Sequence, residues 1–253
     1  LVDISLVHFN DVYQKLGVLL TDKDLAGESK YEILLPEVVT RLEQANLLAF
    51  SQGAEVVFPE GWVNREGEPL PLIIRKGDGG FNYTTTDLAC IIDRVENIGS
   101  SEFLYVVGQE QKQHFAMVFE VARNAGFMDE SVRAVHIPFG MVLGTDGKKL
   151  ASRGGLAISL KDLLDEAVLR ADAAIAEKNQ ELTESERAKI ARMIGIGAVK
   201  YSDLSSDRTK DYTFDWDKML SFEGNTSPYL QYAHARICSI FKKSGIKRES
   251  TRK

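Results

Sequence analysis

The spacing of hydrophobic positions along the chain changes at about residue 155. Before that point, short apolar runs alternate with amphipathic segments whose apolar positions follow a helical period. The runs that fit strands lie at residues 49–58 (two short strands around Gly53), 72–75, 103–107 and 132–137. The segments that fit helices lie at residues 8–17, 33–47, 84–97 and 111–125. Strands that alternate with helices predict an α/β fold with a mostly parallel, doubly wound sheet.

Two of these helices carry well-defined apolar stripes. Leu35, Val38, Val39, Leu42 and Ala45 share one face of the segment 33–47. The segment 111–125 places its apolar residues on one face in the same way, and Gly126 ends it. We expect both stripes to face the core.

After Gly155 only helical patterns remain. They lie at residues 159–178, 183–201, 215–222 and 226–243. Thr183 and Glu186 have the spacing of a capping box, in which each side chain bonds the backbone N–H of the other residue. We therefore expect two domains, a doubly wound α/β domain at residues 1–156 and an α-helical bundle at residues 157–253.

Composition and charge narrow the possible functions only slightly. The chain has 253 residues, and its formal net charge of −6 argues against a strongly basic coat but allows RNA binding in local patches. Cys90 and Cys238 lack the spacing of a metal site, so we expect two buried apolar thiols in a reducing compartment. No run reaches the roughly 18 apolar residues that a membrane span needs. Both ends look cut, and we expect a piece of a longer protein.

A polar cluster in two pieces is the first candidate site. Tyr83 and Asp87 lie four residues apart on a predicted helix, so both face the same way. Gln111 and His114 open the next helix, beyond the carboxyl end of the strand 103–107, where open α/β sheets bind ligands. A carboxylate with planar hydrogen-bonding neighbours suits a guanidinium ligand. Taken singly, these residues also fit simpler roles, namely a carboxylate that complements the helix dipole, a packed tyrosine and solvated caps.

The second candidate site is the glycine-rich segment 139–155, which contains Lys148, Lys149 and Arg153. Cationic side chains and backbone N–H groups in such a loop can stabilise negative charge that develops on a leaving group. In isolation the segment also fits a hairpin with solvated lysines.

The third segment runs from Ser205 to Arg236. Thr226 can cap a helix that has Pro228 in its first turn, and Tyr229, Tyr232 and Arg236 then share one face. Aromatic residues at this spacing pack into a core more often than they stack on bases.

Together the three segments resemble the arginyl-tRNA synthetases, a family of class I aminoacyl-tRNA synthetases. The resemblance covers essentially residues 1–243, and the string 223–236 is its most specific part. It implies that Tyr83, Asp87 and Gln111 line the arginine pocket and that His114 lies beside the nucleotide. Lys149-Leu-Ala-Ser-Arg153 is similar to the family's Lys-Met-Ser-Lys-Ser loop. This similarity implies ATP contacts at Lys148, Lys149, Ser152 and Arg153, although Ala151 stands where the family often has a lysine.

The implied activity is that of an arginine–tRNA ligase. ATP activates L-arginine to arginyl-adenylate, and the arginyl group then passes to tRNA(Arg). Magnesium is expected with ATP without a dedicated protein site, and tRNA is expected to be needed for activation as well. The implied tRNA contacts are Tyr229, Tyr232 and Arg236. The resemblance implies a cytoplasmic protein with no membrane or DNA partner.

The resemblance also implies what the chain lacks. It corresponds to the second half of the class I nucleotide-binding fold and to the start of the helical anticodon-binding domain. The family's His-x-Gly-His type motif is missing, so we expect residues 1–253 alone to be inactive. Two alternatives stay open, another class I synthetase and a non-catalytic RNA-binding module with a decayed site. Ala151 favours the decayed module slightly, and the intact trio of Tyr83, Asp87 and Gln111 weighs against it.

Overall fold

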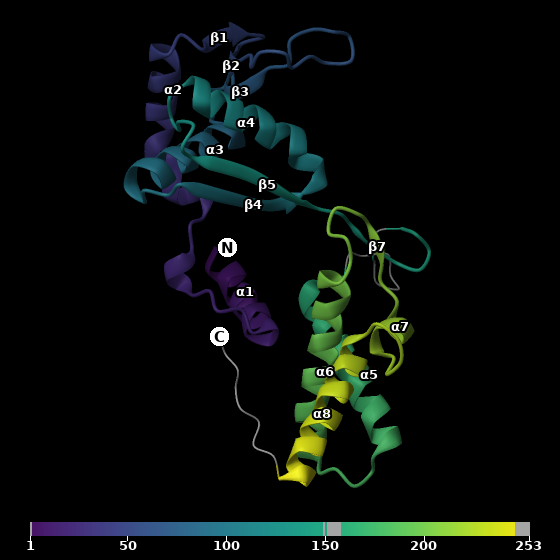
Figure 1. Ribbon diagram of the computed structural model, residues 1–253. Coiled ribbons are helices and arrows are strands. Elements are labelled where there is room, and N and C mark those ends of the chain that lie inside the picture. Colours follow the sequence, from purple (N-terminus) through teal and green to yellow (C-terminus); the bar gives the residue numbers. More distant parts are fainter. Residues whose placement is uncertain (1, 149, 151–157, 246–253) are drawn as a thin grey trace. The chain divides into compact units, whose positions relative to one another are not determined.

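The computed structural model describes residues 2–148, 150 and 158–245. The chain forms two compact units, residues 21–139 and residues 1–20 together with 140–253 (Figure 1). The first unit contains strands and helices, and the second is mainly helical. The division that the sequence predicts between residues 156 and 157 concerns functional domains and stays a prediction.

The unit 21–139 is built from two small sheets and three α-helices. Its elements are η1 (Asp22–Asp24), η2 (Glu28–Leu34), α2 (Leu35–Gln44), β1 (Leu48–Ser51), β2 (Ala54–Val57), β3 (Leu72–Arg75), α3 (Tyr83–Ile92), η3 (Asp93–Asn97), β4 (Glu102–Gly108), η4 (Gln109–Gln111), α4 (Lys112–Asn124) and β5 (Arg133–Phe139). β4 and β5 are parallel, with pairs from Glu102–Arg133 to Gly108–Phe139, and α4 connects them as a crossover helix. This βαβ unit confirms part of the α/β prediction.

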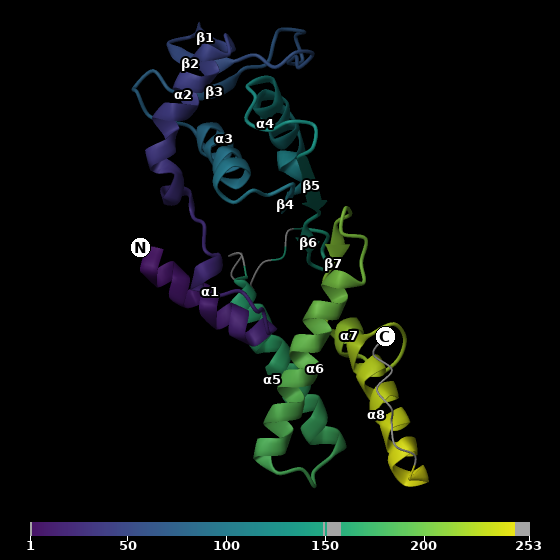
Figure 2. The same cartoon turned by 60° about the vertical axis from the view of Figure 1, so that its left-hand side comes forward.

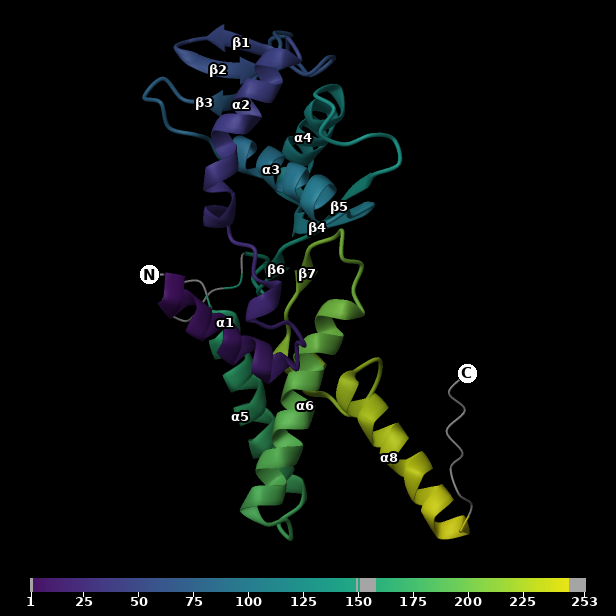
Figure 3. The same ribbon diagram turned by 90° about the vertical axis from the view of Figure 1, so that its left-hand side faces the viewer.

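The prediction of a mostly parallel sheet is wrong for the first three strands. β1, β2 and β3 form an antiparallel sheet, with β2 in the centre (Figure 3). The physical reason lies in the short β1–β2 connection. Only Gln52 and Gly53 join these strands, and both have positive φ (50° and 81°), as in a tight hairpin turn. A parallel pair needs a crossover of a dozen or more residues.

The core of this unit lies between the helices and the sheets. α3 packs beside α2 and α4 (Figure 2). The expected stripe of α2 is confirmed, because Leu35, Val38, Val39 and Leu42 are buried, and only Ala45 is partly exposed. The α4 stripe is confirmed at its four apolar positions, Phe115, Val118, Phe119 and Ala122.

The other unit is organised around a helical hairpin. Its elements are α1 (Val2–Leu16), β6 (Val142–Leu143), α5 (Leu160–Lys178), α6 (Glu184–Leu204), β7 (Tyr212–Thr213), α7 (Trp216–Leu220) and α8 (Ser227–Ser244). The capping box of Thr183 and Glu186 opens α6 as predicted. α5 and α6 approach so closely that a Cβ on Gly195 would lie 2.7 Å from the backbone oxygen of Ala167. The short parallel pair β6–β7 was not predicted, because two residues have no detectable period.

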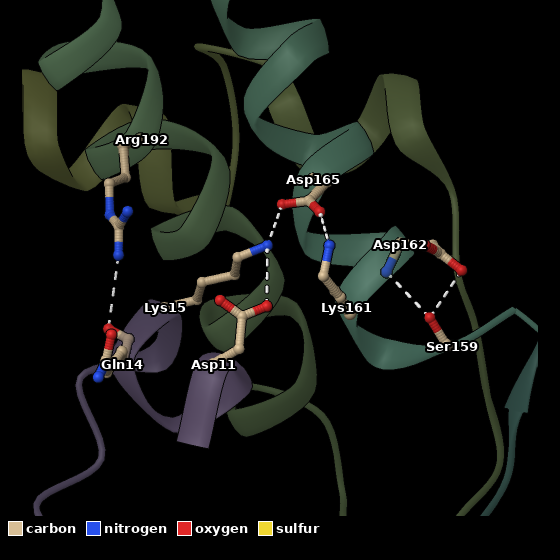
Figure 4. A network of polar contacts seen from close by, with 8 residues as sticks. All are labelled: Asp11, Gln14, Lys15, Ser159, Lys161, Asp162, Asp165 and Arg192. Carbon is tan, nitrogen blue, oxygen red and sulfur yellow. Dashed lines mark hydrogen bonds and ion pairs between the residues drawn. The ribbon is translucent and has the colours of Figure 1, made fainter. Parts of the chain in front are cut away.

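The last turn of α1 is attached to this hairpin by charged side chains (Figure 4). Lys15 forms ion pairs with Asp165 of α5 and with Asp11. The Arg192 guanidinium donates a hydrogen bond to the Gln14 carbonyl at 3.5 Å. In addition, the Lys200 ammonium donates to the Leu16 carbonyl at 2.8 Å. These cations satisfy carbonyl groups that the end of a helix leaves without intrahelical partners.

Candidate active site

The first turn of α3 is fixed in place by its own side chains. The Asn82 side chain accepts a hydrogen bond from the backbone N–H of Tyr83 at 2.9 Å and so caps the helix. The buried Thr85 hydroxyl donates to the Ile74 carbonyl of β3 at 2.5 Å. The start of α3 is therefore anchored to the sheet, and Tyr83 and Asp87 project from a rigid element.

Asp87 and His114 are in direct contact. The His114 Nε2 atom lies 2.7 Å from Asp87 Oδ2, although the two residues are 27 positions apart. The His114 side chain is 14% exposed, and the Asp87 side chain is 28% exposed. A carboxylate that is partly accessible and already oriented by a neighbour can accept further donors from a ligand.

Tyr83 completes a three-residue group. Its ring meets the His114 ring edge to face, with centroids 5.0 Å apart, while the Tyr83 side chain stays largely exposed. The structure thus brings together three of the four predicted residues. Gln111 lies one turn before His114, at the end of η4, with an exposed side chain. Its place in an arginine pocket stays a prediction.

A cluster of aromatic rings packs against His114 on the core side of this group. The Phe115 ring contacts His114 at 5.1 Å, Tyr105 at 4.9 Å and His136 at 5.4 Å between centroids. The His136 Nε2–H donates to the Val107 carbonyl at 3.0 Å. Tyr105 and His136 were not singled out from the sequence. Tyr105 alternates with exposed neighbours along β4, and this pattern could have identified it as facing the core.

Burial raises the pKa values of two groups in the core near Asp87, namely Cys90 and Tyr105. Cys90 lies one turn further along α3, and burial raises the pKa of its thiol. Burial likewise raises the pKa of the Tyr105 hydroxyl above its ordinary value. The expected burial is confirmed for Cys90, whereas Cys238 is only partly buried.

The phosphate-loop candidate is described only in part. The Gly144 N–H donates to the Lys148 carbonyl at 2.7 Å, which closes a tight turn with the Lys148 side chain exposed. Lys149, Ala151, Ser152 and Arg153 lie outside the described residues.

The base of this loop pairs with the segment 208–214. The Gly140 N–H donates to the Arg208 carbonyl at 2.8 Å, and the Met141 N–H donates to Asp211 Oδ1 at 2.7 Å. A Cβ on Gly140 would lie 2.5 Å from the Lys210 carbonyl oxygen, so a larger residue would force the two backbones apart. The second and third sequence segments therefore touch, which their separate analysis did not predict.

The predicted RNA-contacting side chains on α8 are only half buried. Thr226 caps the helix by accepting from the Tyr229 N–H at 3.3 Å, with Pro228 in the first turn as predicted. Tyr229 is 45% exposed and Tyr232 is 47% exposed, so neither is a core residue in this unit. The Arg236 guanidinium donates to the Tyr232 hydroxyl at 2.7 Å, on the same face of the helix.

A groove of about 880 Å³ runs between α6, α8 and the end of α1. Its lining includes Lys15, Arg192, Lys200, Tyr232 and His234, and no carboxylate among the described residues. Most of the remaining lining residues are apolar, and Lys15 is already paired with Asp11 and Asp165, so the groove is an apolar surface with cations at a few positions.

The described residues provide neither a metal centre nor a membrane-spanning helix. There, no group of three or more His, Cys, Asp or Glu side chains is arranged to hold a metal ion. Within the same residues, none of the helices combines the length and apolar character that crossing a bilayer requires.

Comparison with known proteins identifies the family. Residues 1–216 match the family model described as "tRNA synthetases class I (R), catalytic domain". The chain belongs to the class I arginyl-tRNA synthetase family. Among curated relatives, the arginine–tRNA ligase of Thermobifida fusca is 52% identical over 246 residues, and that of Serratia proteamaculans is 48% identical over 246 residues. These alignments cover 97% of this chain but only 42–43% of the relatives, so the chain spans less than half their length.

Solved structures of the same family agree with this assignment. The arginyl-tRNA synthetase of Plasmodium falciparum superimposes with a TM-score of 0.83 at 29% identity, covering 98% of this chain and 40% of that one. The Thermus thermophilus arginyl-tRNA synthetase gives a TM-score of 0.70 at 26% identity over 85% of this chain and 41% of that one. The resemblance inferred from the three sequence segments is thereby confirmed.

Proposed function

We propose that this chain carries the arginine pocket and the phosphate loop of an arginine–tRNA ligase. The observation that carries the proposal is the half-buried carboxylate of Asp87, held by His114 beside the exposed ring of Tyr83. A guanidinium presents donors in a planar fork that matches the two oxygens of a carboxylate. Tyr83 and Gln111 are proposed as further contacts to the arginine side chain.

The proposed chemistry has two steps. A carboxylate oxygen of arginine attacks the α-phosphorus of ATP, the bond to the β-phosphate bridging oxygen breaks, and pyrophosphate leaves. A hydroxyl of the terminal tRNA ribose then attacks the arginyl carbonyl carbon, and AMP leaves. Enzymes of this kind act mainly by positioning the reactants and stabilising charge.

The ATP site is proposed to include Lys148, Lys149, Ser152 and Arg153, with His114 adjoining it by resemblance. The exposed Lys148 on its tight turn supports this part of the proposal. Mg²⁺ is proposed to arrive as part of the ATP substrate.

The proposed tRNA surface is α8 with the adjoining groove. Tyr229, Tyr232 and Arg236 lie on one exposed face, and Arg192 and Lys200 contribute cations to the largely apolar groove beside them. Aromatic rings and cations together suit unpaired bases and phosphates. In the whole protein, we propose that residues 1–156 belong to the second half of the nucleotide-binding fold. Residues 157–253 would begin the helical bundle, and the location would be the cytoplasm.

The test is amino-acid-dependent exchange of pyrophosphate into ATP by the full-length protein, with cognate tRNA present. Arginine should support exchange and charging of tRNA(Arg). Lysine and the uncharged analogue citrulline should support neither, because lysine lacks the fork and citrulline lacks the charge. Exchange with a different amino acid would identify another class I synthetase. Binding of tRNA without exchange would instead identify a decayed module.

A further inference from the structure

We infer that His114 is a positioning residue for arginine, because it holds the Asp87 carboxylate in the orientation that a guanidinium requires. This inference rests on the proposed function. It differs from the role beside ATP that the resemblance suggests, since His114 Nε2 is bonded to Asp87, a proposed arginine contact.

The direction of the hydrogen bond follows from the chemistry of the carboxylate. An ionised carboxylate accepts hydrogen bonds and does not donate them, so His114 Nε2 is the donor and Asp87 Oδ2 the acceptor. Asp87 keeps its attraction for a cationic side chain while His114 sets the direction in which its oxygens point.

The His114 ring is itself restrained. It lies between the Tyr83 ring at 5.0 Å and the Phe115 ring at 5.1 Å, and its side chain is only 14% exposed. Because the ring cannot turn freely, its bond to Oδ2 restrains the carboxylate of Asp87. The second oxygen and the remaining lone pair of Oδ2 stay available for two parallel bonds from a guanidinium. One histidine thus positions both Asp87 and Tyr83, two of the three proposed arginine contacts.

This arrangement bears on the choice between arginine and lysine. A carboxylate that rotates still attracts any cation, but it loses the coplanar geometry that a fork needs. Without the His114 donor, the affinity of the protein for arginine should fall more than its affinity for lysine. The ratio of the two affinities should therefore become smaller.

Two variants of the full-length protein separate the donor from the ring. In His114→Phe the aromatic ring beside Tyr83 remains and the donor is lost. In His114→Gln the ring is lost, but the amide nitrogen overlies Nε2 and still donates to Asp87. Should His114→Phe not fold, His114→Asn replaces it, because its shorter amide does not reach Asp87 Oδ2. Melting temperatures establish which variants are folded.

The measurements are KM and kcat for arginine and for ATP in tRNA-dependent pyrophosphate exchange. His114→Phe should raise the arginine KM by about 10- to 100-fold, as expected for losing a hydrogen bond to a charged group. Its ATP KM should stay within about twofold, and kcat should change less than the arginine KM. His114→Gln should stay within about threefold of the unaltered protein in all three quantities.

Four results would overturn the inference. A rise in the ATP KM with an unchanged arginine KM would place His114 on the nucleotide. A loss of arginine affinity in His114→Gln that equals or exceeds the loss in His114→Phe would show that the donor does not account for the effect. Failure of the unaltered protein to use arginine would overturn the proposed function together with this inference. An unaltered arginine KM in an active His114→Phe variant would overturn this inference alone.

Discussion

Replacing Asp87 with asparagine removes one charge at the centre of the proposed pocket and little else. Asparagine has nearly the same shape, and its Oδ1 can still accept the hydrogen bond from His114 Nε2 that Asp87 accepts at 2.7 Å. The aromatic contact between Tyr83 and His114 does not involve the changed atom. The substitution therefore isolates the charge of the carboxylate.

The magnitude follows from the surroundings of this side chain. Two unit charges at 4 Å attract by about 1 kcal/mol in water and by about 4 kcal/mol at the effective dielectric constant of a protein surface. The Asp87 side chain is 28% exposed, which places it between these limits. Since asparagine keeps one acceptor for the guanidinium, we expect a loss of about 2 kcal/mol, or roughly 30-fold in the arginine dissociation constant.

Isothermal titration of the full-length protein with arginine at neutral pH measures this loss. Asp93→Asn is a matched control, because Asp93 follows α3 on the same stretch of chain, and its carboxylate bonds Lys30 at 2.8 Å and Asn97 at 3.0 Å. It should leave arginine affinity unchanged, and citrulline should bind Asp87→Asn and the unaltered protein about equally. The assignment is refuted if Asp87→Asn keeps its arginine affinity or if Asp93→Asn weakens binding as much.

Three further changes test other parts of the molecule. Lys149→Ala should slow adenylate formation in single-turnover assays while the arginine KM stays the same, and an effect on arginine alone would show that the loop is misplaced. Gly195→Ala should lower the free energy of unfolding in urea by about 1–2 kcal/mol, because the clash with Ala167 outweighs a helix-propensity gain of about 1 kcal/mol; a more stable variant would contradict the close approach. Cys90 should react with iodoacetamide more slowly than Cys238 in peptide mass spectrometry, since burial raises the pKa of the Cys90 thiol, and faster labelling of Cys90 would refute its burial.

The sequence predicted the helices better than the strand pairing. The stripes of α2 and α4 follow from local spacing alone, which requires no knowledge of the rest of the fold. Strand direction depends on the connection as well, and the two-residue turn at Gln52 and Gly53 decided it against the parallel prediction. The contact between Gly140 and Arg208 joins residues far apart in the chain, and no periodicity marks it.

The candidate site shows a similar division. Four-residue spacing correctly placed Tyr83 and Asp87 on one face of α3. The resemblance named His114, but not its partner. The bond to Asp87 depends on how closely α3 and α4 pack, and this distance is set by the core between them rather than by any local pattern.

The attachment of α1 has a consequence for synthesis on the ribosome. Residues 21–139 form one uninterrupted unit that can fold as soon as it has emerged. By contrast, the contact between Lys15 and Asp165 can form only after 150 further residues have been synthesised. The contact between Leu16 and Lys200 requires 184 further residues. At ordinary elongation rates the second interval is roughly 10 to 40 s. During that time Val12 and Leu16, the α1 side chains that pack against the core of α5 and α6, have no partner from those helices, which leaves α1 open to binding by a chaperone.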